Sequence, residues 1–138
     1  GGDGIVTGGA LGVDYFATDG VIKLDKTADK IKVYIPATLE AYAAHYRRRA
    51  EEKVISKEEA ETLISQLNLL QRLNPTALYE DYSGSPVNSE SYSRRNGSVV
   101  NASDELVAFQ VNESTGTQDT IEQAKVKGIP VILKKYKI

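Results

Sequence analysis

The chain has 138 residues, of which 41% are hydrophobic and 26% charged, values typical of one globular domain with enough chain for a buried core. Its formal net charge of −2 argues against nucleic-acid binding through bulk positive charge. The lack of cysteine excludes disulfides, thiolate nucleophiles and thiolate metal sites, and no apolar run approaches the ~20 residues of a membrane span. We therefore expect one cytoplasmic domain, residues 1–138.

The first elements predict a strand, a glycine turn and a helix. A short apolar run, Ile5 and Val6, is followed by small residues, and Val13, Phe16 and Ala17 then have the spacing of one helix face. This arrangement directs backbone N–H groups and the positive end of a helix toward an anion. The turn residues that we expect to contact a phosphate are Thr7, Gly8, Gly9, Ala10 and Gly12.

The next segments predict one strand and two helices in succession. Residues 30–35 alternate apolar and polar side chains and end at a proline, which indicates a strand. A helix is predicted over 37–52. A second helix follows from Ser56, an N-cap with Glu59 three residues later, and its apolar face continues to residue 73. Residues 37–73 thus form a helical excursion from an alternating pattern.

The rest of the chain returns to alternation. Residues 76–91 predict an ordered surface loop, and residues 91–102 predict a helix. Residues 105–111 are the clearest buried strand. After a break at 113–117, a further helix ends at a glycine and residues 129–133 form the last strand.

Strands that alternate with helices predict an α/β fold: a three-layer, Rossmann-like parallel sheet with helices on both faces. In such sheets ligands bind beyond the carboxyl ends of the strands. The turns at 7–12 and 113–117 both follow strands and both lead into helices. We therefore expect them to meet over one end of the sheet and to form an anion pocket.

Three motifs resemble the DNA-processing protein A (Smf) family. The first is Gly8-Gly9-Ala10-Leu11-Gly12-Val13-Asp14, the second is Arg94-Arg95-Asn96, and the third is Thr115-Gly116-Thr117 with Thr120 and Ala124. They occur in the family's order and cover most of the chain apart from about residues 45–88. The wider group is the SLOG superfamily of Rossmann-like domains, which includes the Lonely Guy nucleotide phosphoribohydrolases.

The resemblance implies binding of a nucleotide or nucleotide-derived ligand through a glycine-rich phosphate pocket. Two alternatives stay open: a nucleoside-phosphate N-glycosidase like the Lonely Guy enzymes, and single-stranded nucleic-acid binding like DNA-processing protein A. Thr120 stands where the Lonely Guy motif carries its catalytic glutamate. The further residues expected to contact the phosphate are Arg94, Arg95, Asn96, Ser114, Thr115, Gly116 and Thr117.

The resemblance also implies a strand and helix before the first glycine turn, which are not found in this sequence. In the family's strand order that strand is the centre of the sheet, and its loss would separate two halves with unpaired edges. We expect either an upstream segment or a partner chain to supply it, and favour the upstream segment.

Two carboxylates are candidates for catalysis. Asp14 acts as a general acid or base on a glycosidic bond, binds a ribose hydroxyl, or orders the glycine turn by accepting backbone N–H bonds, and the last role is favoured. Glu113 is the next candidate, since glycoside cleavage passes through a cationic sugar that a carboxylate stabilises. His45, the single histidine, lacks the neighbours of a zinc site. We expect no metal, no cofactor, no membrane contact, and assembly into a homo-oligomer.

Overall fold

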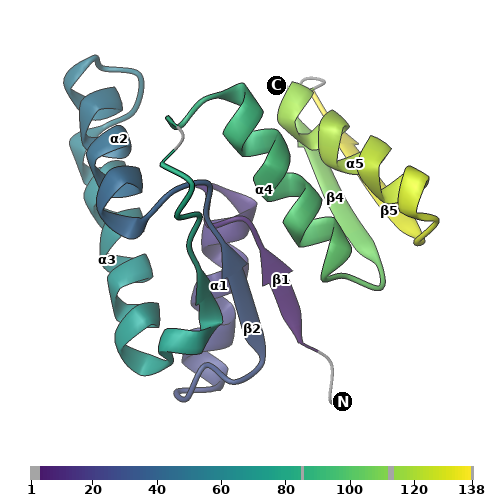
Figure 1. The fold of residues 1–138 in the computed structure, drawn as a ribbon, viewed down its shortest axis with the longest axis horizontal. Coiled ribbons are helices and arrows are strands. Elements are labelled where there is room, and N and C mark those ends of the chain that lie inside the picture. Colours follow the sequence, from purple (N-terminus) through teal and green to yellow (C-terminus); the bar gives the residue numbers. More distant parts are fainter. Residues whose placement is uncertain (1–3, 85, 112–113, 138) are drawn as a thin grey trace. The chain divides into compact units, whose positions relative to one another are not determined.

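The computed structural model describes residues 4–84, 86–111 and 114–137, and the chain divides into two compact units, residues 1–87 and 88–138. Figure 1 shows the elements of each unit. The described residues form five α-helices and short parallel strands in two small sheets. The predicted α/β class is therefore confirmed.

The first unit contains a three-stranded parallel sheet. Its strands are β1 (Ile5–Thr7), β2 (Ile31–Tyr34) and β3 (Leu78–Tyr79), in the order β1-β2-β3. Thr7 pairs with Val33, and Val33 pairs with Leu78, so these three side chains share one face. All three are buried, which makes this face the core side of the sheet.

Strand β3 corrects the prediction of a loop over residues 76–91. The segment begins with a short 3₁₀ helix, η1 (Pro75–Ala77), and continues directly into β3. A strand of two residues is too short to show an alternating pattern, and the surrounding proline, serine and glycine residues are typical of a loop. Pairing with β2 outweighs these local preferences.

Helices α1 (Val13–Leu24) and α3 (Lys57–Leu73) both cover the core face of this sheet. Thr18 of α1 lies 3.4 Å from Thr7 between hydroxyl oxygens, and Leu67 of α3 packs near Val33 beside the glycine turn. Helix α2 (Leu39–Glu51) precedes α3 with no strand between them, as the sequence predicts. The predicted capping box at Ser56 is also confirmed, with both of its hydrogen bonds present.

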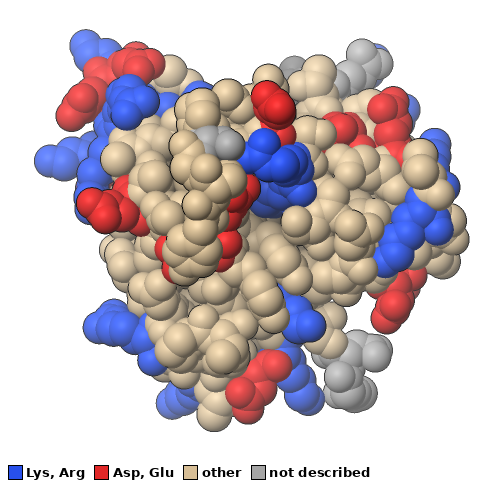
Figure 2. All heavy atoms as spheres, viewed as in Figure 1, with Lys and Arg blue, Asp and Glu red and all other residues tan. Residues whose placement is uncertain are grey.

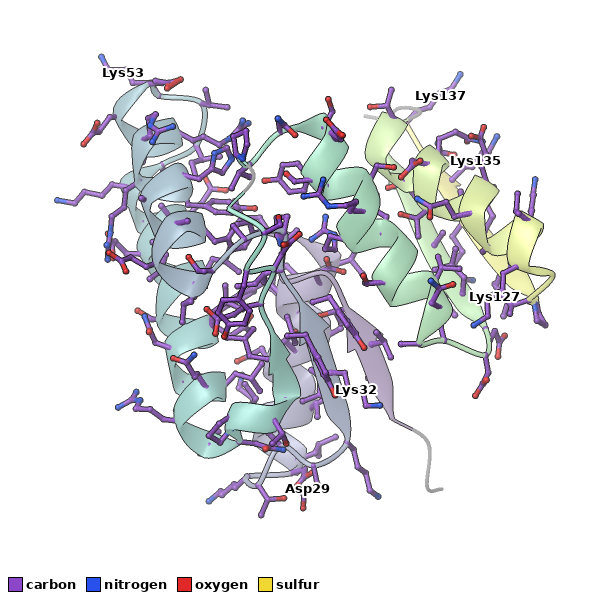
Figure 3. The ribbon with its side chains drawn as sticks, in the orientation of Figure 1. Asp29, Lys32, Lys53, Lys127, Lys135 and Lys137 are labelled. Carbon is purple, nitrogen blue, oxygen red and sulfur yellow. The ribbon has the colours of Figure 1, made fainter. Side chains whose placement is uncertain are left out.

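The other face of this sheet carries a pair of tyrosines. Tyr34 and Tyr79 are register partners on β2 and β3, and their rings stack with centroids 4.5 Å apart. Their neighbour Lys32 is exposed on the same face, where Figure 3 labels it. Burial of the ring raises the pKa of Tyr34 above its ordinary value, and the neighbouring Tyr79 adds to the effect.

The second unit contains two helices and a two-stranded parallel sheet. Its elements are α4 (Ser89–Asn101), β4 (Leu106–Val111), α5 (Thr115–Lys127) and β5 (Val131–Tyr136). The register runs from Leu106 opposite Val131 to Val111 opposite Tyr136. Ala108 and Gln110 are buried, whereas Val107 and its partner Ile132 are about half exposed, at 49% and 46%. On β4, Ala108 and Gln110 therefore face a buried side, whereas their partners on β5, Leu133 and Lys135, are exposed.

Lys127, at the end of α5, joins α5 to the C-terminus of α4. Its ammonium group donates to the backbone carbonyls of Val100, Asn101 and Ser103 at 2.9, 2.9 and 2.8 Å. Figure 3 labels this lysine beside the end of α4. The last carbonyls of a helix have no intrahelical partner and carry the negative end of its dipole, so a cation there stabilises it.

The first strand of each sheet, β1 or β4, lies at an edge of that sheet. Among the described residues β1 pairs with β2, β4 pairs with β5, and no further strand pairs with either β1 or β4. The expectation that another segment supplies a central strand stays a prediction.

Candidate phosphate-binding turns

Asp14 organises the glycine turn between β1 and α1. Its Oδ2 atom accepts hydrogen bonds from the backbone N–H of Gly8 at 3.2 Å and of Ala10 at 3.3 Å. The carboxylate reaches back from the first turn of α1, where a negative charge is also favoured by the helix dipole. This geometry is that of the structural role expected for Asp14, and it engages two of the amides expected to face a ligand.

Gly9 is required for the turn to pack against the sheet. Its φ of +64° is in the left-handed region, and a Cβ would lie 2.7 Å from Ile35 Cγ2 and 3.0 Å from Val33 Cγ1. The Tyr42 hydroxyl donates to the Gly9 carbonyl at 3.1 Å. Tyr42 is buried on α2 and was missed as a turn residue, because its place on the apolar stripe of that helix indicates only packing.

Gly12 leaves the start of α1 open. It is the N-cap residue with a φ of +84° and has no side chain with which to cap the helix, and a Cβ there would have no heavy atom of the described residues within 4 Å. The glycine is needed for its backbone conformation and leaves space beside the first turn. Thr7, by contrast, is buried with its hydroxyl close to that of Thr18, which in turn donates to the Asp14 carbonyl at 2.8 Å.

The turn before α5 is the second predicted set. Ser114 is the N-cap of α5 and makes no side-chain capping bond, while its carbonyl accepts from the buried Gln110 amide at 3.1 Å. Thr115 and Gly116 are exposed, and a Cβ on Gly116 would meet no atom within 4 Å. Glu113, the second candidate for catalysis, lies outside the described residues.

Asn96 ties α4 to the start of α5. Its Nδ2 donates to Asp119 Oδ2 at 3.0 Å and to the Gly116 carbonyl at 3.5 Å, and Gln123 donates to the same Asp119 oxygen at 2.9 Å. These bonds fit the expectation that Asn96 holds the turn beside it. Asp119 was missed because one acidic residue on a helix has no distinctive sequence pattern. Gly97 permits the close packing, since a Cβ there would lie 2.9 Å from Gln123 Oε1.

The two arginines of α4 differ in their surroundings. Arg95 donates through Nε to Asn96 Oδ1 at 3.0 Å, and its guanidinium lies over the Tyr92 ring, 5.2 Å from the centroid. Arg94 is exposed. Figure 2 shows Lys and Arg side chains interspersed with Asp and Glu on the face drawn, rather than gathered by sign.

N-capping separates the five helices into two classes. The side chains of Thr38, Ser56 and Asn88 cap α2, α3 and α4 by accepting a backbone N–H. Gly12 and Ser114 make no such bond at α1 and α5. The two helices that begin without a side-chain cap are the two that follow the predicted turns.

His45 lies on α2, where its ring packs edge-on against Tyr46 with centroids 5.7 Å apart. Desolvation by burial lowers its pKa below the ordinary value, and the charges of Arg49 and Arg48 lower it further. No group of His, Asp and Glu side chains within the described ranges converges well enough to hold a metal ion. No helix in those ranges combines the length and apolar character needed to span a membrane.

Comparisons with known proteins identify no relative of this chain. No protein-family model, no curated protein and no solved structure matches the chain.

Proposed function

We propose that the chain binds a nucleotide or nucleotide-derived ligand through backbone N–H groups at a helix start, at α1 in the first unit and, as a separate site, at α5 in the second. The capping contrast carries this proposal. In α2, α3 and α4 a side chain already satisfies part of the first turn, whereas Gly12 and Ser114 do not. First-turn amides without a cap, at the positive end of a helix dipole, suit a phosphate oxygen.

The residues around each helix start support this role. A Cβ at Gly12 or Gly116 would meet open space, so a phosphate has room to approach the backbone closely. Arg94 and Arg95 supply guanidinium groups suited to bidentate phosphate binding in the second unit. Asp14 then acts as an ordering group for residues 8–10, with the remaining first-turn amides of α1 as the donors to the ligand.

We further propose that the chain has a Rossmann-like, three-layer arrangement. Every strand pair in both sheets is parallel, and strands alternate with helices except at α2 and α3. Parallel sheets are generally covered on both faces, so a further layer over the face of Tyr34 and Tyr79 would complete this arrangement.

The experiment places a negative charge at each helix start. Val13→Asp on α1 and Thr115→Asp on α5 introduce an acid where the helix dipole favours it, so the fold should be kept. Val13→Asn and Thr115→Asn are the matched neutral controls. Binding of the four nucleoside monophosphates and of inorganic phosphate is measured by calorimetry and by thermal stabilisation.

We expect each Asp variant to bind its best nucleotide at least about fivefold more weakly than the matched Asn variant, because a like charge within about 4 Å of the phosphate is repelled. Equal binding by the Asp and Asn variants would contradict the proposal. So would the absence of any melting shift with every nucleotide at millimolar concentration.

The same panel separates the alternatives. Release of free base from a nucleoside monophosphate, abolished by Glu113→Gln, would establish the N-glycosidase instead. Oligonucleotide binding with a steep salt dependence, stronger than binding of any mononucleotide, would establish the nucleic-acid function.

A further inference from the structure

A groove in the first unit lies between α1 and α3, apart from the glycine turn. It encloses about 450 Å³ and is lined by three residues of α1 and six of α3. On α1 these are Tyr15, Asp19 and Ile22, spaced as one stripe of a helix. The lining residues of α3 also repeat at helical spacing, from Glu58 to Leu69. The lining therefore consists of one helical stripe from α1 and one from α3.

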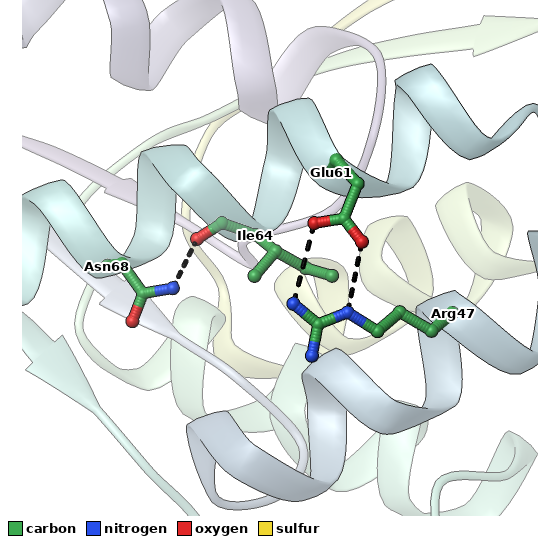
Figure 4. A network of polar contacts seen from close by, with 4 residues as sticks. All are labelled: Arg47, Glu61, Ile64 and Asn68. Carbon is green, nitrogen blue, oxygen red and sulfur yellow. Dashed lines mark hydrogen bonds and ion pairs between the residues drawn. The ribbon is translucent and has the colours of Figure 1, made fainter.

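The ionisable groups that line this groove are acidic. Asp19, Glu58 and Glu61 contribute carboxylates, and the lining includes no lysine or arginine. Asp19 pairs with Lys23 at 2.8 Å, and Glu61 pairs with Arg47 at 3.0 Å. Figure 4 shows the second pair, in which two guanidinium nitrogens face the two Glu61 oxygens.

Both ion pairs lie at the surface. Their side chains are exposed, with relative areas of 73% and 36% in the first pair and 55% and 44% in the second. Exposed ion pairs contribute little to stability, so little free energy is lost when a cation in the groove takes the place of Lys23 or Arg47. Arg47 lowers the pKa of Glu61 chiefly by hydrogen bonding, so this carboxylate stays charged near neutral pH.

Gln66 adds an acceptor that lacks a partner. The residue is 7% exposed and lines the groove, and its Nε2 donates to the Tyr15 carbonyl at 2.9 Å. That bond fixes the orientation of the amide, because a flipped group would place oxygen against oxygen. Its Oε1 atom exposes less than 1 Å² and has no hydrogen-bond partner among the described residues. A buried acceptor in this state is stabilised by any N–H donor that reaches it.

The chemistry of the occupant follows from these three features. The separated carboxylates of Asp19, Glu58 and Glu61 suit a ligand with several separated positive charges. The Gln66 Oε1 atom, which accepts no hydrogen bond from the described residues, suits an N–H donor. The apolar side chains of Ile22 and Leu69 suit an alkyl chain between the charges. A metal ion fits less well, since no described cluster of acidic residues converges to hold one.

We propose that the groove between α1 and α3 binds an aliphatic polyamine, with its ammonium groups on Asp19, Glu58 and Glu61 and one N–H donated to Gln66 Oε1. Access to this oxygen requires a rotation of a neighbouring side chain, a common adjustment on binding. The site goes beyond the proposed nucleotide function and depends on neither helix N-terminus.

Calorimetry with spermidine tests this proposal, with Mg²⁺ at equal ionic strength as the charge control. Spermidine should bind saturably, and Mg²⁺ should neither bind equally well nor displace it. Glu58→Gln should weaken spermidine binding about fivefold, as the loss of one charge contact predicts. Glu40→Gln, an exposed carboxylate on α2 outside the groove, is the matched control and should leave binding unchanged.

A second measurement follows the Gln66 side-chain amide by NMR on the unmodified sequence. Its NH₂ signals should shift as spermidine is added, because Oε1 gains a donor. Lack of saturable binding, equal weakening by the two glutamate variants, or an unmoved Gln66 amide during binding would each overturn the proposal.

Discussion

Removal of the Asp14 carboxylate should destabilise the first unit. Two backbone amides donate to Oδ2, and hydrogen bonds to a charged group contribute about 1.5–3 kcal/mol each. At 3.2 and 3.3 Å both bonds are long, so the lower value applies to each. With about 0.5 kcal/mol lost from the helix dipole, Asp14→Ala should reduce the free energy of unfolding by about 3.5 kcal/mol.

Urea denaturation followed by tyrosine fluorescence measures this loss, because the chain has eight tyrosines and no tryptophan. Asp14→Asn keeps one acceptor oxygen and should lose about half as much. Asp104→Ala removes an exposed carboxylate of the second unit and should stay within about 0.5 kcal/mol of the unmodified chain. The reasoning is refuted if Asp14→Ala is as stable as Asp104→Ala.

Three other changes test single contacts. Tyr42→Phe removes the hydroxyl that donates to the Gly9 carbonyl and should cost about 1 kcal/mol in urea denaturation, whereas an unchanged midpoint would show that this bond does not hold the turn. Lys127→Met removes three hydrogen bonds to carbonyls at and just after the end of α4, so the free energy of unfolding should fall by about 1–2 kcal/mol and amide exchange at residues 98–103 should become faster. Lys125→Met, which removes another exposed lysine from the last turn of α5, should have neither effect. The pKa of His45 is lowered by folding, so the unfolded chain binds more protons and the free energy of unfolding should fall as the pH drops below about 6.5, a slope that His45→Gln should remove. NMR titration of this single imidazole should give a pKa below that of the unfolded chain, and a higher value would contradict the assignment.

The elements with strong local patterns could be predicted from the sequence. The α3 helix combines a capping box at Ser56 with an apolar face, and both features predict a helix that begins there. The strand ending at Tyr34 and the long strand from Leu106 have clear patterns as well. What failed was β3, since two residues carry no period and their strand geometry comes from pairing with β2. The end of the last strand was also wrong: β5 extends beyond residue 133 to Tyr136, because it pairs with β4 as far as Val111.

Within the candidate turns, backbone conformation was more predictable than the side-chain partners. A glycine turn is predicted between the first strand and helix, and Gly9 and Gly12 there adopt a positive φ while Asp14 accepts its backbone N–H bonds. The Tyr42 hydroxyl on Gly9 and the Asp119 carboxylate on Asn96 come from helices distant in sequence. Such contacts depend on tertiary packing, which residue spacing along one helix does not encode.

An NMR titration of the isotope-labelled chain with nucleoside monophosphates tests the central claim most directly, because it observes the backbone amides themselves. The account predicts that the amide signals of residues 11–13 and 115–117 shift saturably, while those at the side-chain-capped starts of α2 and α3 do not. Saturable nucleotide binding that leaves both of the first two sets unmoved would contradict it.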